Sequence, residues 1–423
     1  MAWRKLRDYL IPFVTIALIL TVSFAIIAYG RGYRLDLNKT QLRATGLLSV
    51  TSDPIGAQVY VDGKLKTATN TSLNLSPGQY TIRITKEGYL AWEKPVGVMG
   101  EVVSRADAFL FPTNPSLSPL TSSGVKEPVL SPDGTKIAYI VPPKQIDGNV
   151  NKTGIWVLEL AEGPLGRNRD PVQVASVDPN FDVTAATIVW SPDTTELLLT
   201  VPSRQARLYR TNRLDSFQDA SLTASSLLGE WQDERNGKER QKLAAFKQPI
   251  INMATTSAKI ISFSPDETKI FYEATASATI PTVINPHLLG TNATPETRTT
   301  QPGKLYVYDS REDRNYLLLA KTELPSPTPT PKSPLSSIGN WKLEIGNSTR
   351  SVVWLPTNKH LILTLPGKID VMEYDRTNWI TVYSGPFVEG FVAPWPNGSR
   401  LVVLTNLNQT ASTLPNLYTV NLR

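Results

Sequence analysis

The chain has 423 residues, which is too many for one compact core and predicts two or three modules at about 100 to 200 residues per domain. It has no cysteine and only two histidines, His287 and His360, so thiolate chemistry, disulfide bonds and cysteine-bearing metal sites are excluded. Of the formal charge of +6, residues 1–30 supply +2 (three basic residues against one acidic), and the remaining +4 forms no basic stripe of the kind that binds nucleic acid. The 33 prolines favour turn-rich β structure over a helical fold.

An uncharged apolar segment runs from Tyr9 to Gly30. As a helix rising 1.5 Å per residue it is long enough to cross about 30 Å of hydrocarbon. The sequence therefore predicts a short tail at residues 1–8 and a transmembrane helix at 9–30, with tryptophan and tyrosine placed as an interfacial aromatic belt. A cleavable signal peptide is the alternative, but its apolar region should span only about 7 to 15 residues. We expect an uncleaved, single-pass anchor.

Basic residues lie on both sides of this segment, so the charge rule does not decide its orientation. A polar juxtamembrane linker follows at residues 31–45. Nearly all of the chain lies after the helix, and we expect this bulk to be extracytoplasmic on the grounds of the resemblances described next.

The region 46–112 has the pattern of a small β domain. Val59 and Val61 run into Asp62-Gly63, which is a strong hairpin signal, and Pro77-Gly78 predicts a second turn. Short strands joined by tight turns predict a small β-sandwich.

These residues closely resemble the PEGA domain in four motifs: Ser52 to Ala57, Val59 to Gly63, Leu75 to Tyr80 and Lys86 to Tyr89. The usual Gly-x-Thr-Pro after the hairpin is replaced by Lys66-Thr67-Ala68-Thr69, so we expect a different loop there. The resemblance implies a bacterial or archaeal surface protein and a non-enzymatic structural or interaction module. A plain spacer that holds the next domain off the bilayer is an equal alternative.

Five segments beyond Pro112 repeat one pattern: a strand, a turn on a proline, and a second strand five residues after that proline. The prolines are Pro132, Pro192, Pro265, Pro356 and Pro396. Each unit is followed by a further aromatic and apolar strand, which makes most of a four-stranded antiparallel propeller blade.

The Ser-Pro-Asp repeat resembles the WD-like repeats of the TolB-type β-propeller, over residues 113–423. Three copies keep Ser-Pro-Asp and two are degenerate. Five blades are visible, and we favour a six-bladed ring in which residues 113–127 pair near the C-terminal strand. Relatives of this kind lie outside the cytoplasmic membrane, which together with the PEGA resemblance favours an extracytoplasmic bulk. The fold class is all-β with one N-terminal transmembrane helix.

Two insertions interrupt the repeats. Residues 214–248 are rich in helix formers and carry an apolar face with Leu227, Leu228, Trp231 and Phe246, which is a candidate partner-binding surface. The alternative is that this face packs on the ring. Residues 324–334 form a proline-rich tract that predicts an exposed loop or linker.

Motifs for chemistry are missing: no nucleotide-binding glycine loop and no Gly-x-Ser-x-Gly occur. Asp178 to Asp182 begins like a calcium loop, but Val183 stands where glycine is required, which favours an ordinary Asx turn. We expect His360 to be an exposed turn residue and His287 to lie in a loop. The repeated aspartates are expected to have a structural hydrogen-bonding role in the blade turns: Asp133, Asp193 and Asp266. The sequence thus predicts no catalytic residues, no cofactor and no metal.

We therefore expect a membrane-anchored cell-surface binding or scaffold protein, not an enzyme, whose PEGA-like domain and propeller interact with an envelope protein or glycan. The alternative is an envelope lyase or hydrolase that uses acidic residues in the propeller funnel, since propellers also host such sites. A purely structural spacer or a sensor ectodomain is a third possibility.

Overall fold

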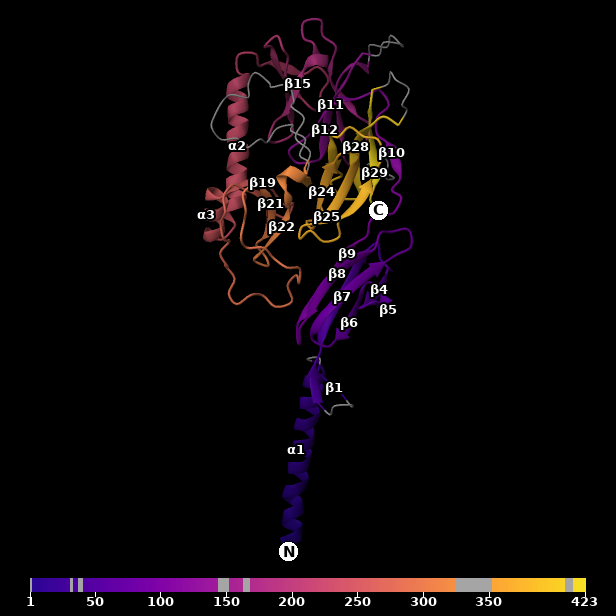
Figure 1. Cartoon of the computed structure of the whole chain (residues 1–423), viewed down its shortest axis with the longest axis vertical. Coiled ribbons are helices and arrows are strands. Elements are labelled where there is room, and N and C mark those ends of the chain that lie inside the picture. The colour runs from indigo at the N-terminus through magenta and orange to yellow at the C-terminus, as the bar shows by residue number, and fades with distance from the viewer. Residues whose placement is uncertain are drawn as a thin grey trace. The chain divides into compact units, whose positions relative to one another are not determined.

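The computed structural model describes residues 2–30, 33–36, 41–143, 152–162, 168–324, 352–407 and 414–423. The chain divides into two compact units (Figure 1). The first contains Met1–Leu110 together with Ile284–Pro295, and the second contains Phe111–Val283 with Glu296–Arg423. The proline-rich tract at 324–334 lies outside the described residues except for Leu324.

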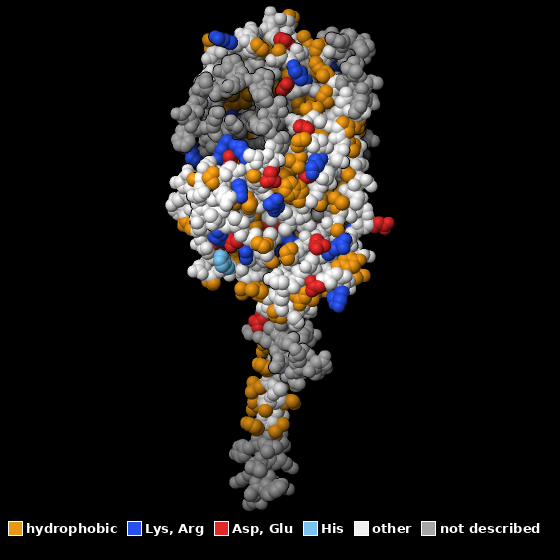
Figure 2. Space-filling view, viewed as in Figure 1, with side chains coloured by type: hydrophobic (Ala, Val, Ile, Leu, Met, Phe, Trp, Pro, Cys, Tyr) orange, Lys and Arg blue, Asp and Glu red, His pale blue; other side chains and the backbone are white. Residues whose placement is uncertain are grey.

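The first unit begins with a long helix, α1 (Ala2–Gly30), followed by a hairpin of β1 (Tyr33–Asp36) and β2 (Gln41–Ala44). Side chains of α1 are described from residue 12 to 27, and all of these are exposed, which Figure 2 shows as a band of apolar atoms. Thr15 Oγ1 donates a 2.8 Å hydrogen bond to the carbonyl of Pro12 inside the helix. Within the described part of the chain, no helix combines the length and apolarity that a membrane crossing requires.

A two-sheet β-sandwich follows. One sheet has the order β6-β3-β9, in which β3 and β9 are parallel, and the other has the order β5-β4-β7-β8. Their bounds are β3 Gly46–Asp53, β4 Gln58–Val61, β5 Lys64–Ala68, β6 Thr71–Leu75, β7 Gly78–Thr85, β8 Trp92–Val98 and β9 Val103–Phe109. Alternate residues of β3 are buried, so Leu48 and Val50 meet Ile82 and Ile84 in the core.

One tight turn of this sandwich and one buried polar contact between its loops follow from local chemistry. Asp62 and Gly63 both have positive φ (48° and 76°), as a tight hairpin between β4 and β5 requires, and glycine adopts this conformation without strain. Thr69, in the stretch that departs from the PEGA pattern, is buried: its hydroxyl lies 2.7 Å from Ser52 Oγ and accepts from the backbone N–H of Ala57. The departure therefore supplies a buried polar contact between two loops.

The described residues of the second unit form five four-stranded antiparallel sheets, which we number as blades 1 to 5 in chain order. Blade 1 is β11 Lys126–Leu130, β12 Lys136–Val141, β13 Gly154–Glu159 and β14 Val172–Ser176. Blade 2 is β15 Thr187–Trp190, β16 Glu196–Thr200, β17 Ala206–Arg210 and β18 Phe217–Asp219. Blade 3 is β19 Ala258–Phe263, β20 Lys269–Ala274, β21 Lys304–Asp309 and β22 Arg314–Ala320. Blade 4 is β23 Val352–Trp354, β24 His360–Leu365, β25 Lys368–Glu373 and β26 Ile380–Tyr383.

Blade 5 is built from both ends of the unit. Its order is β10-β29-β28-β27, with bounds β10 Leu117–Pro119, β27 Val392–Pro394, β28 Arg400–Thr405 and β29 Asn416–Asn421. Ser118 pairs with Thr419, so a strand from the start of the repeats completes the last sheet, and Figure 1 shows β10 beside the yellow β29. The expectation that residues 113–127 pair with the C-terminal strand is confirmed. The preference for six blades is wrong for the described residues, because β10 becomes the fourth strand of blade 5 and leaves nothing to begin a sixth sheet.

Apolar clusters join neighbouring blades. Blade 1 packs on blade 2 through Ile140 and Leu197, and on blade 5 through Tyr139 and Trp395. Blades 3 and 4 share a separate cluster. Sheet packed face to face on neighbouring sheet is the arrangement of a propeller.

Two helices connect blades 2 and 3: α2 (Ala224–Ala244) and α3 (Gln248–Thr256). Trp231 of α2 is buried against Leu198 and Ala206 of blade 2. Phe246 and Ile250 pack instead against blade 3, in a cluster that includes Tyr272 and Tyr308. The helical insertion predicted at 214–248 is present from Ala224, but its first residues include strand β18 of blade 2, and the helical part continues to Thr256.

Candidate interaction site

The Ser-Pro-Asp turns are small, closed hydrogen-bond circuits. In blade 1, Ser131 Oγ donates to Asp133 Oδ1 at 2.6 Å and accepts from the backbone N–H of Lys136 at 2.9 Å. Asp133 also accepts from the backbone N–H and the hydroxyl of Thr135. The turn therefore binds the end of β11 to the start of β12 without help from the rest of the sheet.

The same circuit recurs at Asp193 and Asp266, each with a serine two residues before it and a threonine two residues after it. The hydrogen bond from Ser191 is the largest influence on Asp193 and lowers the pKa of that carboxyl, while burial, the second influence, acts in the opposite direction. Around Asp133 and Asp266 burial is the largest influence and raises the pKa, but the hydrogen bonds together outweigh it, so both carboxyls also titrate below their ordinary range. All three are therefore ionised hydrogen-bond acceptors at neutral pH.

The four apolar residues singled out in the helical insertion do not form a free surface. Trp231 and Phe246 are each 7% exposed. Leu227 and Leu228 are partly buried on the same cluster as Trp231. The apolar face of α2 therefore packs on blade 2, which was the alternative to a partner-binding surface, and it is not available to a partner.

The histidines differ from one another. His287 is exposed in a loop, as predicted. The expectation that His360 is exposed is wrong, because it is 3% exposed. Its ring lies edge-on to Phe111 at 5.5 Å between centroids, and Nδ1 is 2.8 Å from Thr357 Oγ1. Phe111, which lies far away in the sequence, thus helps to bury His360.

The calcium-like loop is an Asx turn. Asp178 Oδ1 accepts from the backbone N–H of Asn180 at 2.8 Å, and this bond is the largest cause that lowers the pKa of Asp178. Its other oxygen, Oδ2, accepts from Arg207 Nη1 at 2.6 Å. Within the described ranges, no three histidine, aspartate or glutamate side chains are arranged to hold a metal ion.

Arg207 is the centre of a partly exposed cluster on blades 1 and 2. Its guanidinium carbon lies 4.1 Å from the ring centroid of Phe217 and 4.6 Å from that of Phe181, so the cation is stacked between two aromatic faces. Phe217 also contacts Tyr209 at 5.2 Å. The stacking fixes a long side chain that would otherwise lose conformational entropy on binding.

Exposed apolar side chains lie on the strands and loops that carry this cluster, and we call them the apolar rim. Ser176 at the end of β14 donates twice to the carboxylate of Asp215, and the N–H of Asp215 donates to the carbonyl of Val174, so the β17–β18 loop lies on β14. The rim residues, exposed by about half, are Val172, Val177, Leu214 and Phe217. Sequence reasoning missed them because the four residues come from two separate blades.

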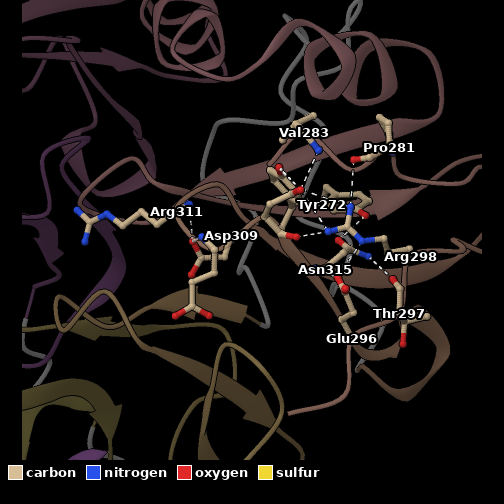
Figure 3. Close-up of polar contacts among 12 residues, drawn as sticks. Tyr272, Pro281, Val283, Glu296, Thr297, Arg298, Asp309, Arg311 and Asn315 are labelled. Atoms are coloured by element: carbon tan, nitrogen blue, oxygen red, sulfur yellow. Dashed lines mark hydrogen bonds and ion pairs between the residues drawn. The ribbon is translucent and has the colours of Figure 1, made fainter. Parts of the chain in front are cut away.

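A buried polar network fixes a long insertion of blade 3, between β20 and β21 (Figure 3). Asp313 is fully buried and accepts from Tyr308 Oη at 2.9 Å and from the backbone N–H of Val283 at 2.8 Å. Arg298 donates to Asp313, to the carbonyl of Pro281 at 3.0 Å, and pairs through Nε with Glu296 at 3.1 Å. Both ends of the insertion are therefore held on the blade by one ion pair and its neighbours.

The acidic side chains of blades 3 and 4 are mostly buried and satisfied locally. Asp370 is 1% exposed and accepts from Lys368, Trp379 and Thr381 at 2.7 to 2.8 Å. Asp309 is 3% exposed and lies 3.6 Å from the ammonium of Lys269. A carboxylate that catalyses must reach its substrate, and these two are closed off from solvent.

Residues 45–110 match the PEGA domain, and no curated protein matches the chain. Among solved structures, the chain is similar to a chain of the mitotic checkpoint complex, with 10% identity, 75% of this chain and 98% of that chain covered, and a TM-score of 0.29. TolB from Acinetobacter baumannii matches with 11% identity, 81% and 59% coverage and a TM-score of 0.22. The RRP9 WD40 repeats match with 8% identity, 74% and 99% coverage and a TM-score of 0.29.

Overall similarity of this size carries no weight for function, and the propeller rests on the strand order of the five sheets and on the pairing of β10 with β29. The match at 45–110 coincides with the two-sheet sandwich of the first unit. The chain therefore combines a β-sandwich that matches the PEGA domain with a β-propeller whose described residues form five four-stranded sheets.

Proposed function

We propose that the chain is a membrane-anchored scaffold that presents its PEGA domain and propeller outside the cytoplasmic membrane and binds an envelope protein or glycan. The observation that carries the proposal is the uncovered apolar surface of α1. Its large apolar side chains between Phe13 and Ile27 are 48 to 73% exposed and point in all directions around the helix. A helix that is apolar all round needs an apolar solvent, and a lipid bilayer supplies one.

The apolar rim on blades 1 and 2 is the binding surface that the geometry favours. It combines half-exposed aliphatic groups with an aromatic ring and an arginine that is already held in place, which is the composition of energetically important protein interfaces. A partner that covers it would therefore be a protein with a complementary apolar surface.

An enzymatic role has less support. Three carboxylates of blades 3 and 4 (Asp309, Glu312 and Asp375) act on Tyr316 and Tyr374, whose pKa values are raised first by burial and then by these charges. Asp309 and Asp375 are 3% and 4% exposed and only Glu312 is partly exposed, so no pair of these carboxylates faces a substrate. Binding is the better explanation of the exposed features.

The absence of native cysteine allows one experiment to test both placement and binding. Val172→Cys, in the apolar rim, is labelled in intact cells with a membrane-impermeant maleimide that carries a benzophenone, and is then irradiated. We expect labelling before lysis and a discrete crosslinked product. Val388→Cys, which replaces another exposed valine (43% against 52%) outside the rim, is the matched control and should be labelled without that product.

Labelling of both variants only after lysis would disprove the extracytoplasmic placement. Equal crosslinking from both positions would leave the placement intact and remove the rim as the binding surface.

A further inference from the structure

A segment of the propeller sequence belongs to the unit of the PEGA domain. Ile284–Pro295, the middle of the β20–β21 insertion, clusters with residues 1–110. Gly290 has φ of +72°, and a Cβ added there would lie 2.8 Å from Val102 Cγ1 and 3.6 Å from the carbonyl oxygen of Val103. The backbone of the segment therefore lies directly on the turn between β8 and β9, and only glycine fits at that contact.

Exposed apolar side chains gather at this contact, and we call them the apolar tip. The two leucines beside Gly290 are Leu288, 48% exposed, and Leu289, 65% exposed. The β8–β9 turn adds Met99, 43% exposed, and Val103, 52% exposed. Four large apolar groups at one corner of a small domain indicate a surface that contacts something other than water.

This corner is also where the chain enters the PEGA domain from α1. The backbone N–H of Leu47 donates to the carbonyl of Val102 at 3.2 Å, and that of Glu101 donates to the carbonyl of Thr45 at 3.4 Å. The apolar tip thus lies at the end of the sandwich where β3 begins. Ile55, another exposed apolar residue of this domain, follows the opposite end of β3.

The tether between this corner and α1 is short. In the β1–β2 hairpin Tyr33 is paired with Ala44, so the chain goes out and returns. Three residue steps lead from Gly30 to Tyr33 and one leads from Ala44 to Thr45, each spanning at most about 3.5 Å, and the paired residues Tyr33 and Ala44 are about 5 Å apart. The distance from Gly30 to Thr45 is therefore about 20 Å or less. The apolar tip is therefore kept close to the end of the helix, whatever the angle of the tether.

We propose that the apolar tip inserts into the interfacial layer of the lipid bilayer that holds α1, as a second, shallow membrane contact. The proposal rests on the proposed anchor, since only an inserted α1 brings a bilayer within reach of the tether. The leucines supply the apolar contact, while the exposed His287 beside them stays among the head groups.

The test uses full-length protein in liposomes, with single cysteines carrying an environment-sensitive fluorophore and lipids carrying a nitroxide quencher near the head group. Leu289→Cys reports on the apolar tip. Ile55→Cys is the matched control, because it is equally exposed (66% against 65%) in the same domain. Phe24→Cys in α1 reports on the anchor itself.

We expect quenching at Phe24 and Leu289 but not at Ile55. Adding Met99→Asp should lower the quenching of the Leu289 label at least about twofold, because a charged side chain opposes interfacial insertion. Quenching at Phe24 together with equal, low values at Leu289 and Ile55 would overturn the membrane contact and leave the anchor standing. No quenching at Phe24 would overturn both.

Discussion

At the scale of single residues, the blade turns show how a short motif acquires its role. Serine, aspartate and threonine at positions 131, 133 and 135 satisfy one another before any neighbouring strand is involved. In blade 4 the motif is Leu-Pro-Thr, and Thr357 turns instead to His360. In the degenerate turn a threonine therefore replaces the aspartate, and its hydroxyl contacts a buried histidine.

The lowered pKa of Asp193 makes part of the stability dependent on pH. A carboxyl whose pKa is lower in the folded chain contributes stability above its ordinary pKa of about 4, and loses it as the pH falls through the depressed value. We expect Asp193→Asn to lower the free energy of unfolding at pH 7 by about 0.5 to 1 kcal/mol, allowing for solvent screening at this exposed turn. Urea unfolding at pH 7 and pH 3 measures this, and the difference between the two proteins should shrink at pH 3.

Ser191→Ala removes the largest cause of the shift and should reproduce the loss. A difference between wild type and Asp193→Asn that stays constant from pH 7 to pH 3 would contradict the assignment.

The turn aspartates could be identified from sequence because the circuit is local, within five residues. His360 could not, since its burial depends on Phe111, which lies about 250 residues earlier. The same limit applies to Arg207, whose two aromatic neighbours come from a different loop and a different strand. No spacing in the sequence records such contacts.

At the scale of elements, the β20–β21 insertion shows how a long loop is given a fixed position. Its ends are joined by an isolated bridge between Thr279 and Thr299 and by the backbone hydrogen bond from Ile280 to the carbonyl of Arg298. The Arg298–Asp313 pair then ties this stem to the turn before β22. A loop of this length without secondary structure is usually either functional or disordered, and here its stem is ordered.

Removing the cation should release this insertion. Arg298→Met leaves the fully buried Asp313 without its charged partner, which typically costs about 3 to 5 kcal/mol. We expect a lower unfolding midpoint and faster amide hydrogen exchange in residues 275–303. Arg311→Met in the same blade breaks a solvent-exposed pair with Asp266 and, as the control, should change stability by less than about 1 kcal/mol.

Equal effects of the two substitutions would show that the network does not hold the insertion. Exchange that accelerates throughout blade 3, and not only in the insertion, would assign the pair to the stability of the whole sheet.

The helical insertion could be predicted because its residues favour helix formation over a long run. Its function could not, since an apolar helix face has the same pattern whether it binds a partner or covers a sheet. Trp231 settles the matter by its burial against blade 2. The apolar tip was missed for the opposite reason: Leu288 and Leu289 lie in a loop with no periodicity.

At the scale of the whole propeller, one side-chain position joins neighbouring blades. It lies four residues after each repeat proline. Lys136 of blade 1 donates to the carbonyl of Thr194 of blade 2 at 3.1 Å, and Lys269 of blade 3 lies 4.9 Å from the ring of Tyr374 of blade 4. Arg400 of blade 5 pairs with Glu162 of blade 1 at 2.9 Å. In three of the five repeats this position therefore links its blade to the next one.

The closing pair of strands is the long-range contact on which the ring depends. Ser118→Cys with Thr419→Cys should form a disulfide, because these residues are directly paired and the chain has no other cysteine. It closes a loop of about 300 residues, so we expect stabilisation of about 2 to 4 kcal/mol, lost on reduction. Thermal unfolding with and without reductant measures the difference.

Thr187→Cys with Thr200→Cys is the control, because this pair lies within blade 2 and closes only a short loop. Stabilisation by the control as large as that by the closing pair would contradict the importance of the closure.

The propeller itself could be recognised from the constant interval between each proline and the next strand. The number of blades could not, because only the pairing of β10 with β29 shows that residues 117–119 complete the fifth sheet of the described residues and do not begin another. A three-residue strand in a proline-rich stretch carries too little pattern to reveal which sheet it joins.

The closure of blade 5 has a consequence for biosynthesis. β10 emerges from the ribosome about 300 residues before β29, and at about 5 to 20 residues per second it waits roughly 15 to 60 s for its partner. During that interval its backbone groups and the adjacent faces of blades 1 and 5 remain open to water and to other chains. The nascent propeller therefore stays open to chaperones and proteases until translation reaches its last strand.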